Sequence, residues 1–277
     1  MDRIRLIASD MDATLLDEQS QLPADFEETI HALAELGIRF APASGRPLYT
    51  LEAMFPTLQD ELVFIGDNGG AIRWKGQNLF TSEMSPEGWR ALNRLTREQG
   101  DIAVLCGLES AYVERPFAVH DAVLRHFYTK IEYVDRLEDV AAPADKFTIY
   151  LPQHNAQQAY DTVYASQRSI YSVAVAGECW VDIMNPGVHK GAALQTLGQL
   201  WGLPPECMMG FGDTYNDAEM LRTAKYGFLM ENGSEPLRQK VPFLAPSHRE
   251  AGVMQILQKV LAQNGFVCPA DFTPAHE

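Results

Sequence analysis

The chain has 277 residues, of which 46% are hydrophobic and 21% charged, a balance typical of a globular protein with one large or two smaller domains. Its 22 basic and 37 acidic residues give a net charge of −15, which argues against a nucleic-acid partner because a phosphate backbone needs a basic surface. The sequence has no apolar run of about 18 residues, so we expect no membrane span. We also expect no signal peptide, because acidic residues interrupt the opening segment MDRIRLIASDMDATL.

The segments of the first 84 residues alternate between strand and helix patterns. Residues 24–36 carry apolar side chains at helical spacing, and a second helix is expected to open within residues 44–55. Residues 71–80 predict a hairpin with Lys75 and Gly76 at its tip. The apolar runs that predict buried strands are residues 4–9, 38–44 and 61–69. This alternation predicts a parallel sheet covered by helices.

The pattern changes near residue 85 and returns near residue 187. Between these points, helical stretches at 86–98 and 155–168 stand among strand-like runs such as KFTIYL, which predicts an inserted α+β region. The later elements are expected at 189–201 (helix), 207–212 (strand), 217–224 (helix), 226–230 (strand) and 250–263 (helix). We therefore expect one domain from residues 1–84 and 187–277 and a second from residues 85–186. We expect the tail from residue 268 to be loose.

The four cysteines are scattered along the chain, and no two of them form a CxxC pair. They are Cys106, Cys179, Cys207 and Cys268. This usage predicts reduced thiols and a cytoplasmic location.

Two carboxylates follow the first predicted strand. Asp10 and Asp12 are separated by one residue, and Thr14 comes two positions later. Ligands bind at the carboxyl end of a parallel sheet, so one acid can be a nucleophile and the other a general acid and base. Like charges this close raise each other's pKa, and a divalent cation would compensate for their repulsion. The alternative is a solvated loop or a helix cap.

The segment Ala43-Ser44-Gly45-Arg46-Pro47 follows the second predicted strand. A hydroxyl, a glycine N–H and a helix start can together cradle a phosphate. In isolation, the serine is better explained as an ordinary helix N-cap.

Lys190 stands at the head of a predicted helix. A cation there opposes the helix dipole, which is unfavourable for the helix but suited to binding an anion. The neighbouring His189 has no metal-type partner four residues on, and we expect it to be a surface residue.

An acidic loop follows the predicted strand at 207–212. Asp213 and Asp217 flank it, and Asn216 lies beside them. Such a set suits Mg²⁺, which takes one or two carboxylates and keeps several waters. The alternative is a turn followed by an Asp-rich helix start.

Together, in this order, the four motifs resemble those of the haloacid dehalogenase superfamily of phosphatases, in its Cof-type branch. The matching segments are DMDAT, ASGRP, Lys190 and GDTYND, with FIGDNGG, GFLMENG and REAGV as further matches. The resemblance covers nearly the whole chain, and CGLESAYV and WVDIMNPGVHKG look most like the enterobacterial sugar phosphatases of this branch. It implies a Rossmann-like parallel-sheet core with helices on both faces and an inserted α+β cap of type IIB.

The resemblance also implies catalytic roles. Asp10 would attack phosphorus and become an aspartyl phosphate. Asp12 would protonate the leaving alcohol and then activate water. Ser44, Lys190 and Asn216 would hold the transferring phosphoryl group.

A magnesium ion is implied in the same way. Mg²⁺ would sit between Asp10, the backbone carbonyl of Asp12 and Asp213, with Asp217 as a supporting carboxylate. In the phosphate-binding segment, Gly45 would join Ser44, and Arg46 is a possible substrate contact.

Two positions depart from the family pattern. Ala13 stands where the family has glycine, and we expect it to take a negative φ because alanine is strained at positive φ. Glu231 stands where glycine is usual in the segment MENG.

The leading hypothesis is a Mg²⁺-dependent phosphatase of small phosphorylated metabolites, in particular sugar phosphates, acting as a monomer or weak homo-oligomer. A phosphotransferase or phosphomutase could use the same nucleophile. A phosphosugar-binding protein without catalysis is the third alternative. Asp12 argues against this last alternative, because binding alone needs no second acid.

Overall fold

The structure is a computed structural model that describes residues 1–276. Its main sheet has six strands. Five of them run parallel, and the strand at one edge, formed by the C-terminal residues Thr273–Pro274, runs antiparallel to its neighbour. In spatial order the strands are β17 (Thr273–Pro274), β15 (Phe243–Ala245), β14 (Tyr226–Met230), β13 (Met208–Gly212), β2 (Leu6–Ser9) and β3 (Arg39–Pro42). A separate two-stranded sheet forms where β1 (Asp2–Arg3) pairs antiparallel with β16 (Phe266–Val267).

Helices cover both faces of the main sheet, so every residue of β2, β13 and β14 is buried. Helices α1 (Phe26–Glu35), α2 (Leu48–Ala53) and α9 (Gly252–Ala262) pack on one face, against the aromatic side chains of the strands. Helices α6 (Lys190–Trp201) and α7 (Ala218–Thr223) pack on the other, and α8 (Glu235–Arg238) lies beside α7. This arrangement confirms the predicted Rossmann-like α/β core. Among residues 1–276, no helix is long and apolar enough to cross a bilayer.

The third predicted strand joins the main sheet less fully than expected. Strand β4 (Val63–Gly66) touches it through a single parallel bridge between Ala43 and Ile65. Strand β3 ends at Pro42, and the bridge lies in the segment that connects β3 to α2. On its other edge, β4 pairs antiparallel with β5 (Ala71–Trp74), which forms the predicted hairpin with β6 (Gln77–Thr81).

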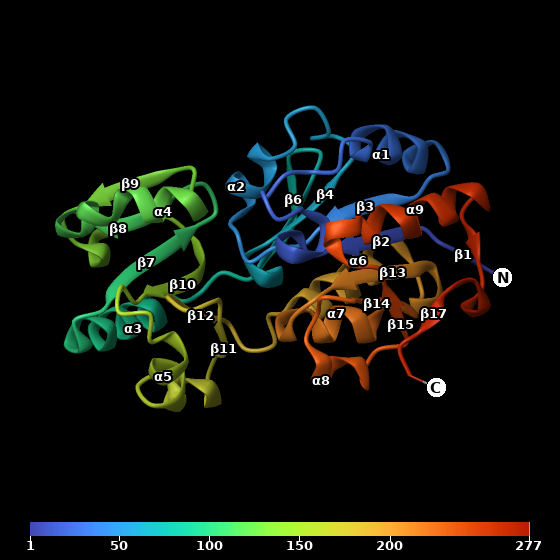
Figure 1. The fold of residues 1–277 in the computed structure, drawn as a ribbon. Helices are drawn as coiled ribbons and strands as arrows, with labels where there is room; N and C mark the ends of the chain where they lie inside the picture. The colour runs from blue at the N-terminus through green and yellow to red at the C-terminus, as the bar shows by residue number, and fades with distance from the viewer. Residues whose placement is uncertain (277) are drawn as a thin grey trace.

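A second six-stranded sheet lies to one side of the core, and two chain segments connect it to the core (Figure 1). Its strands are, in spatial order, β11 (Ser172–Val175), β12 (Trp180–Met184), β10 (Ala144–Tyr150), β7 (Ile102–Gly107), β8 (Ala111–Glu114) and β9 (Ile131–Val134). Helices α3 (Pro86–Gln99) and α5 (Ala156–Asp161) pack on one face and α4 (Asp121–Phe127) on the other. We call this region, residues 86–184, the cap.

The cap helices differ from the sequence prediction in two respects. The helix expected at 155–168 ends at Asp161, because Thr162 leaves the helical region at φ −116° and ψ −80°. A separate turn of 3₁₀-helix follows at Ala165–Ser169. Helix α4 was not predicted.

The tail expected to be loose is instead part of the core, as far as the structure describes it; Glu277 lies outside the described residues. Phe272 is buried, and its ring lies 5.0 Å from that of Phe228 and 5.7 Å from that of Phe243. Strand β17 then closes the edge of the main sheet. These contacts come from residues far away in the sequence, so the local composition of the tail did not reveal them.

Phe272→Ala should lower the free energy of unfolding by about 3 kcal/mol or more, because it removes a large buried side chain. Phe266→Ala is a matched control, since that residue is 41% exposed, and it should cost about 0.5 kcal/mol or less. Chemical denaturation of both variants measures the difference. Equal losses would show that the tail does not belong to the core.

Candidate active site

Two neighbouring parallel strands end in the acidic motifs. Strand β2 ends at Ser9 and β13 at Gly212, and each is followed directly by an aspartate, Asp10 and Asp213. The two strands are paired in register, and the Asp10 amide donates to the carbonyl of Phe211 at 2.9 Å. Parallel pairing therefore brings together two carboxylates that are about two hundred residues apart in the sequence.

The loop after β2 turns back on itself at Ala13. This residue has φ 57° and ψ 14°, so the expected negative φ was wrong. The left-handed conformation costs alanine about 1 kcal/mol. It is held by long-range contacts: Asn232 donates to the Ala13 carbonyl at 2.9 Å, and the next residue, Thr14, donates to Asp213 Oδ1 at 3.3 Å.

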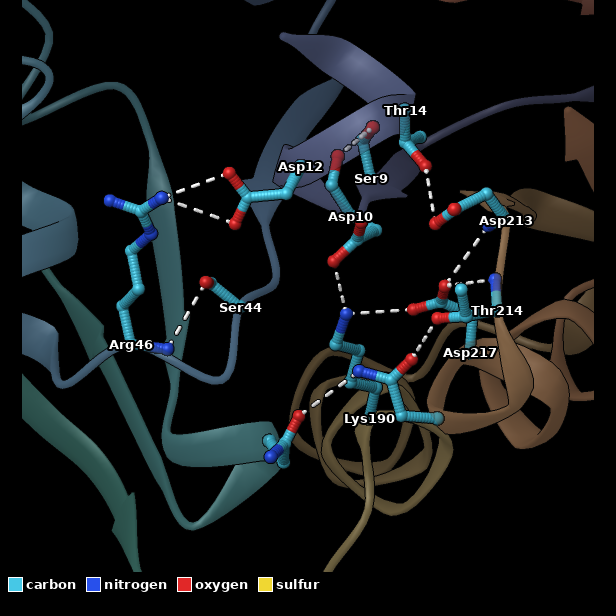
Figure 2. A network of polar contacts seen from close by, with 12 residues as sticks. Ser9, Asp10, Asp12, Thr14, Ser44, Arg46, Lys190, Asp213, Thr214 and Asp217 are labelled. Atoms are coloured by element: carbon cyan, nitrogen blue, oxygen red, sulfur yellow. Dashed lines mark hydrogen bonds and ion pairs between the residues drawn. The ribbon is translucent and has the colours of Figure 1, made fainter. Parts of the chain in front are cut away.

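Lys190 is fully buried at the start of α6 and lies between two carboxylates. Its Nζ donates to Asp10 Oδ1 and, at 2.7 Å, to Asp217 Oδ1 (Figure 2). Burial alone would lower the pKa of Lys190, but the two carboxylates raise it above its ordinary value. The lysine is therefore charged and fixes the direction of the Asp10 carboxylate.

Asp217 is completely buried and organises the acidic loop. Its Oδ2 accepts hydrogen bonds from the amides of Asp213, at 3.0 Å, and Thr214, at 3.2 Å. This approach requires glycine at position 212, because a Cβ there would lie 2.4 Å from the Cβ of Asp217. With both its oxygens engaged by the protein, Asp217 is arranged as a supporting carboxylate.

Three acids lie together with a single lysine, which leaves excess negative charge. Asp10, Asp213 and Asp217 each place an oxygen within 4.8 Å of the others. Burial raises the pKa of Asp10 to about 8, with Lys190 opposing the rise and the other two acids adding to it. Burial and Asp217 raise the pKa of Asp213 to about 6. Ligands of one Mg²⁺ lie roughly 3–4 Å apart, so this set fits a hard divalent cation.

The carboxylate of Asp12 lies outside this group. It points toward Arg46, whose Nη2 donates to Oδ1 at 2.9 Å and Oδ2 at 3.2 Å (Figure 2). The Asp12 side chain is 57% exposed and faces the cavity. Arg46, expected as a substrate contact, is engaged by Asp12 in this structure.

The expected phosphate-binding residues lie around a cavity of about 420 Å³ that Asp10, Asp12 and Asp213 also line. Ser44 is buried, and its Oγ accepts from the amide of Arg46 at 3.1 Å. Gly45 and Asn216 line the cavity too. Fully buried Lys190 reaches this group through Asp10.

Sequence reasoning missed several residues at the site. Asn68, Lys146, Thr148 and Asp182 line the cavity, and Thr14 supports Asp213. Thr14 and Asn68 stand within the motifs already noticed, but a buried strand such as KFTIYL gives no sign of which residue faces a ligand. His189, expected at the surface, is half-buried and caps α6, with its Nδ1 accepting from the Ala192 amide at 3.1 Å.

The fold and the site together define an α/β core with a cluster of three acids at the carboxyl edge of its sheet. The chain matches the family model of haloacid dehalogenase-like hydrolases over residues 7–257. It belongs to this family, and its relatives place it among the family's phosphatases.

Relatives and solved structures agree with this assignment. The 5-amino-6-(5-phospho-D-ribitylamino)uracil phosphatase YbjI of Escherichia coli is 32% identical over 262 residues, covering 93% of this chain and 96% of the relative. The HMP-PP phosphatase of Cronobacter sakazakii is 31% identical, covering 87% and 89%. The crystal structure of SMU.1108c from Streptococcus mutans matches with a TM-score of 0.85 and 28% identity, covering 94% of this chain and 99% of that one.

Asp213→Asn should stabilise the metal-free protein at about pH 8 and not at about pH 4. The folded protein holds the pKa of Asp213 at about 6, above its ordinary 3.8, so it favours the protonated form. The contribution of protonated Asp213 to the free energy of unfolding is therefore fully present below about pH 4, and it is lost as the pH rises through about 6. At pH 8 the wild-type protein must hold Asp213 ionised in a buried site, which lowers its free energy of unfolding. The neutral asparagine avoids this cost, so the variant's free energy of unfolding should be higher by on the order of 1–3 kcal/mol.

Melting in EDTA across this pH range measures the effect. Asp60→Asn, at an exposed position, is the matched control and should show no such pH dependence. A gain for Asp213→Asn that is equal at both pH values would contradict the strained-acid interpretation.

Proposed function

We propose that this protein is a Mg²⁺-dependent phosphatase that hydrolyses small phosphorylated metabolites, in particular sugar phosphates, through an aspartyl-phosphate intermediate. The observation that carries the proposal is the Asp10 carboxylate, which Lys190 holds at the edge of the cavity. A second acid, Asp12, faces the same cavity. A binding protein has no need of this nucleophile and acid pair.

The reaction takes two steps. In the first, an Asp10 oxygen forms a bond to phosphorus while the ester P–O bond breaks, and the leaving oxygen takes a proton from Asp12. In the second, Asp12 takes a proton from water, whose oxygen attacks phosphorus. Inorganic phosphate leaves and the Asp10 carboxylate is restored.

The surrounding residues hold the phosphoryl group during both steps. The ammonium of Lys190, the hydroxyl of Ser44 and the amide of Asn216 are the donors that we assign to its oxygens. The residues that would hold Mg²⁺ are Asp10 and Asp213, with the Asp12 carbonyl, while Asp217 supports them. When bound, the ion supplies positive charge that favours ionised carboxylates and stabilises charge on the phosphoryl oxygens.

The leaving group would be recognised by the cap, which we propose extends over residues 85–186 as a domain inserted in the core. A cavity of about 420 Å³ suits a small metabolite. Its cap wall combines apolar and polar side chains, namely Phe127, Tyr128, Lys146, Thr148, Val175, Trp180 and Asp182. The names of the two relatives, both phosphatases of small phosphorylated compounds, support the same substrate class.

The four unpaired cysteines support a cytoplasmic location.

The proposal is tested by measuring phosphate release from a panel of sugar phosphates, with Mg²⁺ and with EDTA. Wild type should release phosphate only with the ion, and Asp10→Asn should fall to the background rate and form no trappable phosphoenzyme. Melting of Asp10→Asn checks that the variant is folded. Full turnover by this variant would refute the covalent step, and full wild-type activity in EDTA would refute the metal.

Asp12→Asn should lower turnover of a sugar phosphate by roughly 10²–10⁴-fold, the range of a positioned general acid and base. A p-nitrophenolate leaving group needs little protonation, so the first step on p-nitrophenyl phosphate should suffer less. Single-turnover kinetics of both substrates measure that step in wild type and variant. Equal losses for the two leaving groups would remove Asp12 from the general-acid role.

A further inference from the structure

A strained turn lies between the phosphate-binding segment and the cap. Asp67, Asn68 and Gly69 have φ values of 50°, 55° and 99°, which non-glycine residues adopt only when their surroundings impose them. The turn bonds directly to the phosphate-binding segment: the Asp67 amide donates to the Arg46 carbonyl and the Asn68 amide to the Ser44 carbonyl, each at 2.9 Å. The shapes of the two segments therefore depend on each other.

A buried cation from the cap reaches across to both segments. Lys146, on β10, is 2% exposed, and its Nζ donates to the Gly45 carbonyl in the phosphate-binding segment. The same Nζ lies 2.9 Å from Asp67 Oδ1 in the strained turn and 3.5 Å from Asp182 Oδ2 on β12. A buried ammonium is tolerated only when its partners are all in place, so these contacts depend on the position of the cap.

A chain of hydrogen bonds continues from the cap to the acidic loop. Asp182 accepts from Thr148 Oγ1 at 2.6 Å and from Asn68 Nδ2 at 3.2 Å. Asn68 in turn accepts from Asn216 Nδ2 at 3.4 Å. Two residues assigned to the phosphoryl group, Ser44 and Asn216, are thus both bonded to the turn that the cap residues hold.

We propose that Lys146 is a positioning residue that couples the closed position of the cap to assembly of the phosphate-binding segment; this inference rests on the proposed function. Lys146 reaches Gly45 and Asp67 only while the cap lies over the cavity. When the cap moves away, the strained turn loses its buried cation and the segment at Ser44–Arg46 loses its support. The phosphate site is then complete only when the cap excludes water from it.

The test uses Lys146→Met, Lys146→Arg and a matched control, Lys225→Met. Lys225 is an exposed lysine that pairs with a single carboxylate, Asp2 at 2.7 Å, in the core domain and away from the cavity. In Lys146→Met, kcat/KM for the best sugar phosphate should fall about 10²-fold, mainly in kcat, as expected when reacting groups are misplaced by about 1 Å. Lys146→Arg should recover part of the loss, and Lys225→Met should match wild type.

Hydrogen exchange provides a readout that does not require activity. Amide exchange in a peptide covering residues 40–50 should speed up about tenfold or more in Lys146→Met and remain unchanged in Lys225→Met. If exchange changes as expected but wild type hydrolyses no phosphate ester, the coupling stands and the proposed phosphatase function fails. If wild type is active and Lys146→Met changes neither kcat nor exchange, the coupling is wrong.

Lys146→Met leaves the buried carboxylate of Asp67 without its cation, and this uncompensated charge can unfold the single variant. The double variant Lys146→Met/Asp67→Asn removes both charges, while Asp182 keeps its bonds to Thr148 and Asn68. If the lysine acts through the turn, Asp67→Asn alone should already lower kcat, and the double variant should lose no more than the larger single loss. Fully additive losses would mean that the two residues act separately, which overturns the coupling.

Discussion

The buried contact of Lys190 with Asp10 and Asp217 is the interaction on which the site depends. A fully buried ammonium is costly, and here two carboxylates compensate for that cost. In return, the lysine fixes the direction of Asp10 and reduces the repulsion among three neighbouring acids. Removing Lys190, Asp10 or Asp217 would leave uncompensated charge in the interior. The segments that carry these three side chains must therefore fold together.

The parallel sheet is what makes this contact possible. Asp10 and Asp213 come from the ends of paired strands, and Lys190 comes from the first turn of a helix on one face. Close approach is as important as topology, since the missing side chain at Gly212 makes room for Asp217. The backbone amides that bond to Asp217 then give the acidic loop a single shape.

The overall charge of −15 is unfavourable for binding an anionic ligand, and the local arrangement of cationic side chains offsets it. Cationic side chains are concentrated at the cavity: Lys190 behind Asp10, Arg46 beside Asp12 and Lys146 from the cap. Each is already paired with an acid, so the site has positive groups in place without a net positive surface. A divalent cation would add the charge that remains lacking.

The sequence alone was sufficient for the α/β core and for locating its four motifs. Apolar runs such as residues 4–9 show a buried strand, and an acid directly after a strand must lie at the sheet's carboxyl edge. Long-range contacts decided the rest. Asn232 helps hold Ala13 at positive φ, Arg46 turns Asp12 away from the other acids, and three aromatic rings draw Phe272 into the core. In the sequence, Lys146 is only one polar residue of a predicted strand. The packing of the cap against the core brings its Nζ to the Gly45 carbonyl. The partners of a side chain depend on tertiary contacts, and its neighbours in the chain do not determine them.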